Sequence, residues 1–325
     1  MKKRLLTLGL CSAAILSGCG FGNVKINPNK EKYVVGIAQF VEHKALDLAT
    51  QGFKERLTEL LTTEGRQVEF EETNSLGDPT LTPTVVSTLV AKDVDLIMAN
   101  ATPCVSAAYS ATYTIPILGT SVTDYGVAIE KELKNNTTGV NLSGTSDLAP
   151  LDQQVNEMVS LLGEGRTKYG ILYCSNEANS KFQADEVKRL LEAKGKQVTI
   201  YTFAQETEIV STCGTIAAQM EAVFVPTDNT CDKYSETLGT ALAGIPVYSG
   251  ESGICEGCGF ATLSIDYLTL GKITGEMAFN VLLGKKDIRN YEIQYDRNPV
   301  KKYIASRCTA LGIVVPSDYV AIPEE

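Results

Sequence analysis

The sequence predicts an α/β fold with two similar lobes, each built around a parallel sheet. Short apolar runs alternate with amphipathic stretches from Tyr33 onward, and the same alternation starts again near Leu151. Repeated strand–helix alternation with short connections is typical of a parallel sheet covered by helices. An Ile-Pro pair begins a strand in each half, at Ile115 and at Ile245, soon after a helix rich in Ala, Ser and Thr. A chain of 325 residues is long enough for two such domains.

The first half of the chain contains the clearest helix. Ala49, Phe53 and Leu57 recur at helical spacing and share one side of the stretch 44–63. The strands around it are short apolar runs, which Gly and Pro residues separate from the helices. The expected strands are 34–40, 68–72, 95–99 and 115–120, and the expected helices are 44–63, about 83–91 and 103–113.

The second half repeats this order of elements. The expected helices are 151–162, 180–194, 206–217 and 230–242, and the expected strands are 169–174, 198–203, 222–225 and 246–249. A further helix, at about 267–283, follows both halves. The C-terminal portion is therefore expected to be shared between the two lobes.

The N-terminus has the features of a secretory signal. Three basic residues precede a run of about twelve mostly apolar residues, too short for a membrane span of about 20. The run ends in Leu16-Ser17-Gly18-Cys19, which resembles the lipobox of bacterial lipoproteins. That resemblance implies removal of residues 1–18 and lipidation of Cys19; the alternative is an ordinary signal that happens to contain a cysteine. Residues 20–32, rich in Asn, Gly and Lys, are expected to form a flexible tether.

Charge and cysteine content exclude several classes of protein. A net charge of −10 argues against a nucleic-acid-binding surface. Of nine cysteines, the signal removes Cys11 and the lipid takes Cys19, and the remaining seven do not form a regular disulfide framework. Cys174 is expected to be buried in a strand. For Cys255 and Cys258, a loop disulfide or two free thiols fits better than a metal or redox site.

No catalytic constellation emerges from the sequence. The sequence contains a single histidine, His43, which argues against a histidine-based catalytic triad or metal cluster. The chain also lacks a Gly-rich phosphate loop. We therefore expect no enzymatic activity, no metal and no cofactor.

The polar residues at the carboxyl ends of the strands are the candidate site. Open parallel sheets bind ligands at those ends, where helix N-termini also point. Ser121 and Thr123 offer hydroxyl donors for a carboxylate. Asp228 and Glu177 are suited to an ammonium group, and Phe40 to covering an apolar side chain. The expected ligand-binding residues are Gln39, Phe40, Thr102, Ser121, Thr123, Asp124, Glu177, Asn179, Ser180, Asp228 and Asn229.

The same residue types have a second interpretation. Ser, Thr, Asp and Asn just before a helix are the usual N-caps. Thr102 precedes Pro103, and Asp228 precedes the helix expected near Thr230. Capping and ligand contact therefore both stay open for these residues.

Several short motifs occur in an order that resembles a known family. They are Val35-Gly36-Ile37-Ala38-Gln39, Thr102-Pro103, Ser121-Val122-Thr123-Asp124, Glu177-Ala178-Asn179-Ser180 and Val225-Pro226-Thr227-Asp228-Asn229. Over about residues 33–323 the sequence resembles the ABC-transporter substrate-binding lipoproteins related to the tryptophan-binding type. The resemblance implies a periplasmic-binding-protein type I fold, in which two Rossmann-like lobes, joined by three crossover segments, close on a ligand. Departures from the family pattern include Tyr125, where the family often has Pro, and the Cys255–Cys258 pair. The segment 303–312 also departs, with Ser306-Arg307-Cys308 where an Asn is usual.

The resemblance also implies an organisation and a function. Lobe 1 is expected to comprise 33–141 plus about 263–296, and lobe 2 to comprise 142–262 plus about 297–325. The expected function is that of a monomeric receptor, lipid-anchored on the extracytoplasmic face of the cell membrane. It would capture an aromatic or large apolar L-amino acid and deliver it to an ABC permease. The alternatives are a receptor for a sugar or another small polar metabolite, and an exported enzyme that uses the cleft carboxylates.

Overall fold

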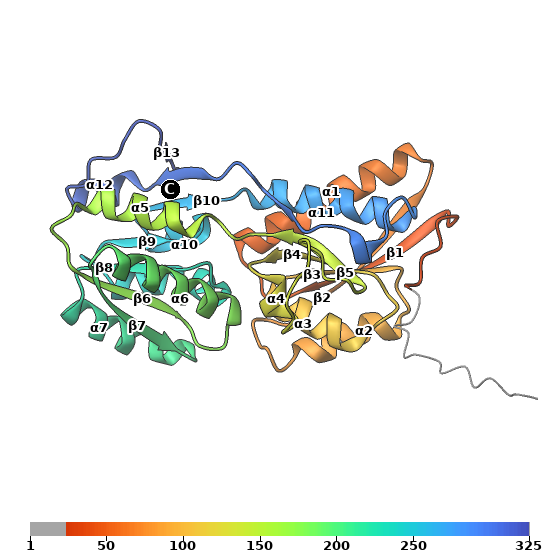
Figure 1. Ribbon diagram of the computed structural model, residues 1–325, viewed down its shortest axis with the longest axis horizontal. Helices are drawn as coiled ribbons and strands as arrows, with labels where there is room; N and C mark the ends of the chain where they lie inside the picture. The colour runs from red at the N-terminus through yellow and green to blue at the C-terminus, as the bar shows by residue number, and fades with distance from the viewer. Residues whose placement is uncertain (1–23, 325) are drawn as a thin grey trace, which may run out of the picture.

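The computed structural model describes residues 24–324, which fold into two lobes lying end to end (Figure 1). The strands of lobe 1 are β1 (Lys32–Gln39), β2 (Gln67–Asn74), β3 (Leu96–Asn100), β4 (Ile117–Val122), β5 (Leu142–Ser146) and β11 (Gln294–Tyr295). Its helices are α1 (Lys44–Thr63), α2 (Thr82–Ala91), α3 (Thr102–Ala111), α4 (Tyr125–Ala128) and α11 (Tyr267–Leu282), with a 3-10 turn η2 (Ile288–Asn290).

Lobe 2 has the same kind of elements. Its strands are β6 (Lys168–Cys174), β7 (Gln197–Phe203), β8 (Ala222–Val225), β9 (Val247–Ser249), β10 (Ala261–Ser264), β12 (Val300–Tyr303) and β13 (Val320–Ala321). Its helices are α5 (Leu151–Leu162), α6 (Ala178–Ala193), α7 (Ile209–Gln219), α8 (Asn229–Lys233), α9 (Ser235–Ala241), α10 (Ser252–Gly257) and α12 (Ala305–Ala310), with a 3-10 turn η1 (Glu206–Glu208).

Each lobe contains one sheet. Within residues 24–324, lobe 1 has a parallel six-stranded sheet in the order β11-β5-β4-β3-β1-β2. Lobe 2 has a seven-stranded sheet in the order β13-β12-β10-β9-β8-β6-β7, parallel except where β10 pairs with β12. The predicted fold class, an α/β protein with two lobes and parallel sheets, is confirmed.

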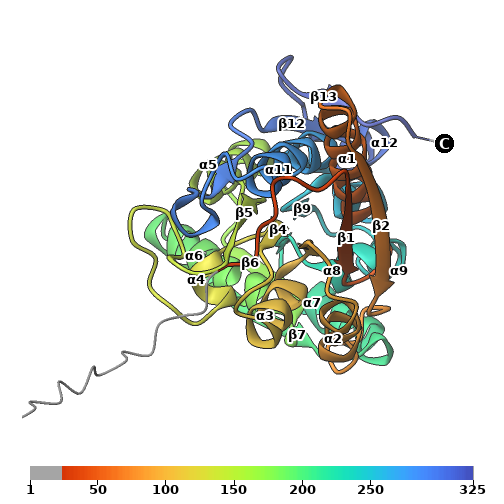
Figure 2. The same cartoon turned by 90° about the vertical axis from the view of Figure 1, so that its right-hand side faces the viewer.

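Helices cover both faces of the lobe 1 sheet, with α1 and α11 on one face and α2 and α3 on the other (Figure 2). Successive strand residues point to opposite faces. Ile37 packs with Phe53 of α1 and Met277 of α11, all of them buried. Ala38 and Ile97 belong to the core on the opposite face. This double cover explains why these strands are continuous apolar runs in the sequence.

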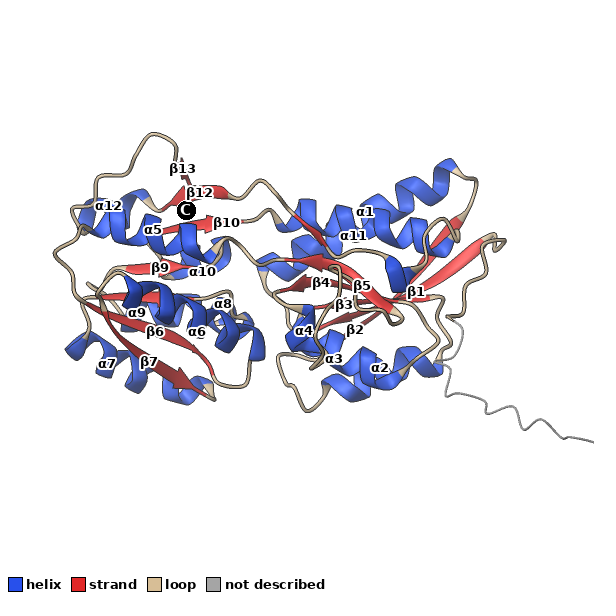
Figure 3. Ribbon diagram, in the orientation of Figure 1, coloured by secondary structure: helices blue, strands red, loops and turns tan. Residues whose placement is uncertain are grey.

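Three segments cross between the lobes within the described range, and they are drawn as loops in Figure 3. They follow β5, β10 and β11, the last leading into β12. The first boundary, expected after residue 141, lies later in the chain: β5 pairs with β4 in the lobe 1 sheet, so the chain leaves lobe 1 after Ser146. The expectation followed the family resemblance, and β5 is short and contains Gly and Ser, so the residues themselves give no strand signal that would have corrected it.

The part of the expected tether that the structure describes is packed on lobe 1. Val24 and Ile26 lie against the lobe 1 core, and the Lys25 N–H donates to the Thr114 carbonyl at 2.7 Å. Lys30 pairs with Asp95 at 2.5 Å. For residues 24–31 the prediction of a flexible tether is therefore wrong, because apolar and ionic contacts fix this segment. The signal and Cys19 lie outside the described residues.

Other differences concern short elements. The helix expected at 230–242 is divided into α8 and α9 at Tyr234. The helix expected at 206–217 begins as the 3-10 turn η1 and continues as α7.

None of the helices within residues 24–324 has the length and apolar character that a membrane span requires.

The cysteines of the described chain are free and buried. The prediction that Cys174 is buried in a strand is confirmed. Cys255 lies within α10 and Cys258 directly follows it, so the loop disulfide is wrong and the pair remains as two thiols. Burial raises the pKa of both thiols far above its usual value.

Candidate ligand-binding site

The lobes meet at the carboxyl ends of their strands, around a small polar cavity of about 10 Å³. This volume is roughly that of one water molecule, so the lobes close tightly here. Lobe 1 contributes the β1–α1 loop and the start of α1 to the cavity wall. Lobe 2 contributes α8 and the residues that follow β8 and β9. The first crossover and the start of α11 complete the wall. The lining residues are His43, Ala45, Leu46, Asp147, Thr227, Asp228, Asn229, Asp232, Glu251 and Tyr267.

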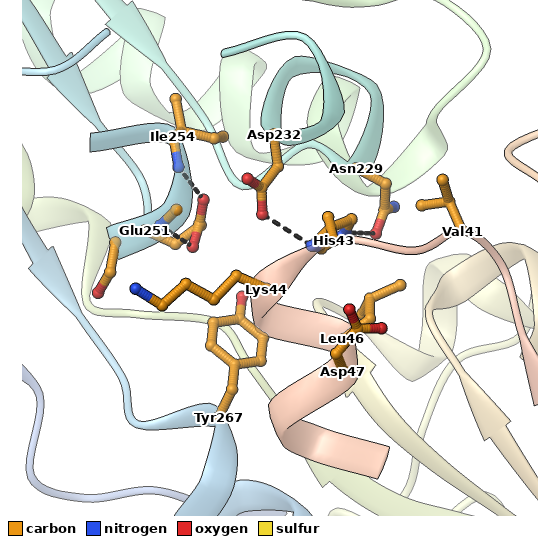
Figure 4. A network of polar contacts seen from close by, with 12 residues as sticks. Val41, His43, Lys44, Leu46, Asp47, Asn229, Asp232, Glu251, Ile254 and Tyr267 are labelled. Atoms are coloured by element: carbon orange, nitrogen blue, oxygen red, sulfur yellow. Dashed lines mark hydrogen bonds and ion pairs between the residues drawn. The ribbon is translucent and has the colours of Figure 1, made fainter. Parts of the chain in front are cut away.

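Acidic side chains dominate this cavity, which we call the acidic cavity. Asp147, Asp228, Asp232 and Glu251 are buried. Of the described residues that line it, His43 alone is basic. Figure 4 shows His43 pointing from the β1–α1 loop towards Asp232 of α8. Four carboxyl groups thus share a site with one cation.

Burial and mutual repulsion perturb these carboxyl groups. Burial, together with the nearby Glu177, raises the pKa of Asp228 to about 8. Burial, together with Asp232, raises the pKa of Glu251 to about 8, and burial raises the pKa of Asp147 to about 6. A buried carboxylate is costly unless a cation or donors compensate it. The site is therefore poised to accept positive charge.

Asp228 is both an N-cap and part of the cavity wall. Its Oδ1 accepts from the Cys231 N–H at 2.7 Å, which caps α8, and its Oδ2 accepts from the Cys174 N–H at 2.8 Å. The residue is 1% exposed. Each oxygen retains one lone pair, so the capping role leaves room for a further donor.

Glu177 is occupied within its own lobe. Its Oε1 accepts from the backbone and the hydroxyl of Thr230, at 2.8 and 2.7 Å. Its Oε2 accepts from the backbone and the side chain of Asn229, at 2.9 and 2.6 Å. These four bonds hold Asn229 and the start of α8 in place, so Glu177 is better suited to positioning than to binding an ammonium group.

Thr123 and Gln183 connect the lobes at a second point. The Thr123 hydroxyl donates to Asp147 Oδ1 at 3.2 Å and accepts from Gln183 Nε2 of α6 at 3.4 Å. Gln183 Nε2 also donates to the Thr227 carbonyl at 3.0 Å. Thr123 therefore lies where the two lobes touch.

Ser121, Asn179 and Ser180 lie at the ends of strands or the start of α6. The Ser180 hydroxyl donates to the Thr227 carbonyl at 3.2 Å. Within the described structure, Ser121 Oγ and Asn179 Oδ1 are buried without a hydrogen-bond partner. Ser121 also has a positive φ of 54°, an uncommon conformation for a residue with a side chain. Such unpaired polar atoms call for an explanation, and a bound ligand is one.

Other predicted site residues lie elsewhere. Gln39 bonds within lobe 1, donating to Asp47 Oδ1 at 2.6 Å and accepting from Thr50 at 2.7 Å. Asp124 caps α4 through the Val127 N–H at 2.8 Å. Thr102 is buried at the start of α3. None of these three lines the acidic cavity, and the same holds for Ser121, Thr123, Glu177, Asn179 and Ser180.

A second cavity, which we call the apolar-walled cavity, lies beside Asn229 and has a volume of about 180 Å³. Phe40, Val41 and Pro79 of lobe 1 face Tyr234 and polar residues of lobe 2 across it. Asn229 lines both cavities. Phe40, which the sequence placed over an apolar group, therefore lies between the lobes.

The residues missing from the predicted site are His43, Asp147, Asp232, Glu251 and Tyr267. His43 lies just after β1, so the strand-end rule extended by a few residues would have included it. Asp232 lies one helical turn after Asp228. Asp147 and Tyr267 lie at two of the crossovers, and the Tyr267 hydroxyl donates to Asp147 Oδ2 at 3.1 Å. No local signal marks that pair.

Two α/β lobes, joined by crossovers and meeting in a polar site at the ends of their strands, define a type I periplasmic binding protein. The chain belongs to the family of ABC transporter substrate-binding proteins: the family described as ABC transporter substrate binding protein matches residues 34–308. A tyrosine-binding protein of Clostridioides difficile (strain R20291) is 32% identical over 298 residues, which are 87% of this chain and 85% of that protein.

Two solved structures show the family fold in different states. A Streptococcus pneumoniae ABC domain in complex with L-Trp matches with a TM-score of 0.80 at 31% identity, over 87% of this chain and 96% of that chain. The ligand-free, open structure of a substrate-binding protein with adhesive properties from Clostridium difficile matches with a TM-score of 0.67 at 29% identity, over 90% and 100%. As a whole chain, the present structure is thus more similar to the L-Trp complex than to the open, ligand-free structure.

Proposed function

We propose that this substrate-binding protein captures an aromatic L-amino acid between its lobes and delivers it to an ABC permease. The protein acts outside the cytoplasm, as a monomer held to the membrane by lipid on Cys19. The relatives named for tyrosine and crystallised with L-Trp support this choice of ligand.

The observation that carries the proposal is the charge balance between the lobes. Asp147, Asp228, Asp232 and Glu251 are buried around a cavity where His43 supplies the basic group. An α-ammonium group beside Asp228 would supply missing positive charge through charge-assisted hydrogen bonds. A sugar offers no such charge, so this site favours an amino acid over a sugar.

The remaining parts of an amino acid also find suitable groups. The Ser121 hydroxyl lines neither cavity, but it is buried without a hydrogen-bond partner in the described structure, and it would donate to the α-carboxylate. The apolar-walled cavity, with Phe40 and Tyr234, is suited to an aromatic side chain. Asn229 lies between the two cavities and orients the ligand from one to the other.

Ligand class is tested by calorimetry on residues 20–325. The hydrophobic cores of both lobes lie within 24–324, so this fragment keeps both lobes. We expect L-tyrosine or L-tryptophan to bind with a dissociation constant of about 1 μM or lower. The heat-capacity change should be negative, because the aromatic ring is buried. D-amino acids serve as the matched control.

Two outcomes would reject this ligand class. Binding of sugars alone would favour the alternative receptor on the same fold. Chemical conversion of any of the tested amino acids or sugars would support the alternative of an exported enzyme.

The lipid anchor is tested with Cys19→Ala, and Cys11→Ala is the matched control. The thioether needs the Cys19 sulfur, and acyl chains contribute about 0.8 kcal/mol for each buried methylene. We expect the Cys19 variant to leave the membrane fraction, and the Cys11 variant to remain in it. Membrane fractionation and mass spectrometry measure this. An acylated Cys19→Ala protein would contradict the lipoprotein assignment.

A further inference from the structure

His43 is a lobe 1 residue whose polar partners lie on lobe 2. Its Nδ1 lies 2.7 Å from Asp232 Oδ2, and its Nε2 lies 3.3 Å from Asn229 Oδ1. The side chains of His43 and Asp232 are each 7% exposed. The contact angle of the first pair falls outside hydrogen-bond geometry, so the pair is best described as a buried ion pair.

Charged and titratable groups surround His43 on every side. Helix α8 contributes Asp232 and Lys233. Helix α10 contributes Glu256, and Glu251 directly precedes it. The crossovers contribute Asp147 and Tyr267. Its own segment adds Glu42, Lys44 and Asp47, and Arg307, Glu236 and Glu324 line the outer mouth of the same region. Lys44 forms an ion pair with Glu256, with Nζ 2.7 Å from Oε1. The charged groups that share the acidic cavity with His43 are Asp147, Asp228, Asp232 and Glu251, all of them acidic.

The low exposure of the His43–Asp232 pair distinguishes it from the Lys44–Glu256 pair, which also joins the lobes. The side chains of Lys44 and Glu256 are 61% and 32% exposed, and such exposed pairs contribute little. His43 and Asp232 are instead withdrawn from water, where losing one charge leaves the other buried and uncompensated. Opening the lobes would separate the pair and return both groups to solvent.

We propose that His43 is a proton-dependent latch: the protonated imidazole on lobe 1 holds lobe 2 closed through Asp232, and loss of the proton favours opening. This proposal goes beyond the proposed function, since it concerns closure of the lobes and is independent of which ligand they enclose.

The direction of the pH dependence follows from the environment of His43. Burial alone lowers its pKa, but Asp232, assisted by Glu251, outweighs burial and raises the pKa to about 9. In an open form His43 returns to an ordinary pKa of about 6.5. Because the pKa is higher in the closed form, the contribution of His43 to closure is complete below about pH 6.5. It is lost as the pH rises through about 9.

The buried carboxyl groups act in a different window. Glu251 and Asp228 have pKa values raised to about 8, and Asp147 to about 6. Their contributions to closure also fall with rising pH, but between about pH 4 and pH 8. A comparison of wild type with a His43 variant at each pH cancels titration of the ligand itself. It retains the coupling of His43 to Glu251 and Asp147, whose pKa values the His43 charge lowers.

The test uses His43→Gln, Asp232→Asn and Lys44→Gln, with L-tyrosine and L-tryptophan as probes. We expect the ratio of the His43→Gln to the wild-type dissociation constant to be about tenfold or more at pH 6. The ratio should fall to within about twofold at pH 9.5. The double variant His43→Gln/Asp232→Asn should bind no more weakly than His43→Gln alone. Lys44→Gln, which removes the exposed pair, should change binding by less than about twofold at either pH.

Small-angle scattering of the ligand-free protein gives a readout that needs no ligand. Wild type should be more compact at pH 6 than at pH 9.5. The change between the two pH values should be smaller in His43→Gln, because only the buried carboxyl groups still contribute to it. If neither amino acid binds, the ligand proposal fails, and the scattering comparison alone decides on the latch. Where a probe binds, a pH-independent binding ratio overturns the latch. Otherwise the latch is overturned when wild type and His43→Gln change their dimensions equally between the two pH values.

Discussion

Replacing Asp228 with alanine is expected to weaken amino-acid binding by about 2–5 kcal/mol. Asp228 is buried at the inter-lobe cavity, so its removal would leave the ligand ammonium group without its carboxylate partner. The variant should also lose about 1 kcal/mol of stability as an N-cap. A further small loss should follow because the Cys174 N–H loses its acceptor. Calorimetry measures the dissociation constant, and denaturant unfolding measures stability.

Two further variants separate charge from capping. Asp228→Asn keeps one oxygen acceptor but loses the negative charge, so it should bind weakly while remaining more stable than the alanine variant. Asp266→Ala removes a cap of the same kind, from the Thr269 N–H at the start of α11, outside the acidic cavity. It should lose about 1 kcal/mol of stability and keep normal affinity. If Asp228→Ala binds its ligand normally, Asp228 is a cap alone and the proposed ammonium site is wrong.

Gly271→Ala is expected to destabilise the protein by at least about 2–3 kcal/mol. Gly271 lies on α11 where that helix crosses α1, and an added Cβ would lie well inside contact distance of the Ala49 carbonyl oxygen. The obstacle is helix backbone, which cannot rotate aside as a side chain can. Gly52 of α1 faces the Leu268 carbonyl in the same way, so both glycines allow the close approach of the two helices.

Gly214→Ala is the matched control for this effect. Gly214 also lies within a helix, α7, but an added Cβ there meets nothing within 4 Å. Alanine should stabilise that helix by up to about 1 kcal/mol, because it has the higher helix propensity. Denaturant unfolding of both variants measures the difference. Equal stabilities would show that the α1–α11 contact adjusts easily and does not depend on glycine.

Long, periodic elements can be predicted from the sequence with good boundaries. The helix expected at 44–63 has the bounds of α1, and that expected at 151–162 has the bounds of α5. Both helices have several turns, so the helical spacing of their apolar residues can be recognised in the sequence. The short elements β5, β10, α4 and α10 are missed, since four to six residues contain too little periodicity.

The strand-end rule locates part of the site from residue types and their order along the chain. It identifies Asp228 and Asn229 at the end of β8, and both line the inter-lobe cavity. The rule depends only on strand direction, which alternating strands and helices determine. It also selects Gln39 and Glu177, whose hydrogen bonds within their own lobes no pattern of residue types reveals.

Two α/β lobes, and the sheet edges where polar groups gather, can be predicted from the amino-acid sequence because both follow from local periodicity and strand direction. The contacts of His43 with Asp232 and of Asp147 with Tyr267 emerge only in the folded chain. These pairs join segments far apart in the sequence. Their distances depend on how the crossovers set one lobe against the other, a rigid-body geometry that no local pattern of residues encodes.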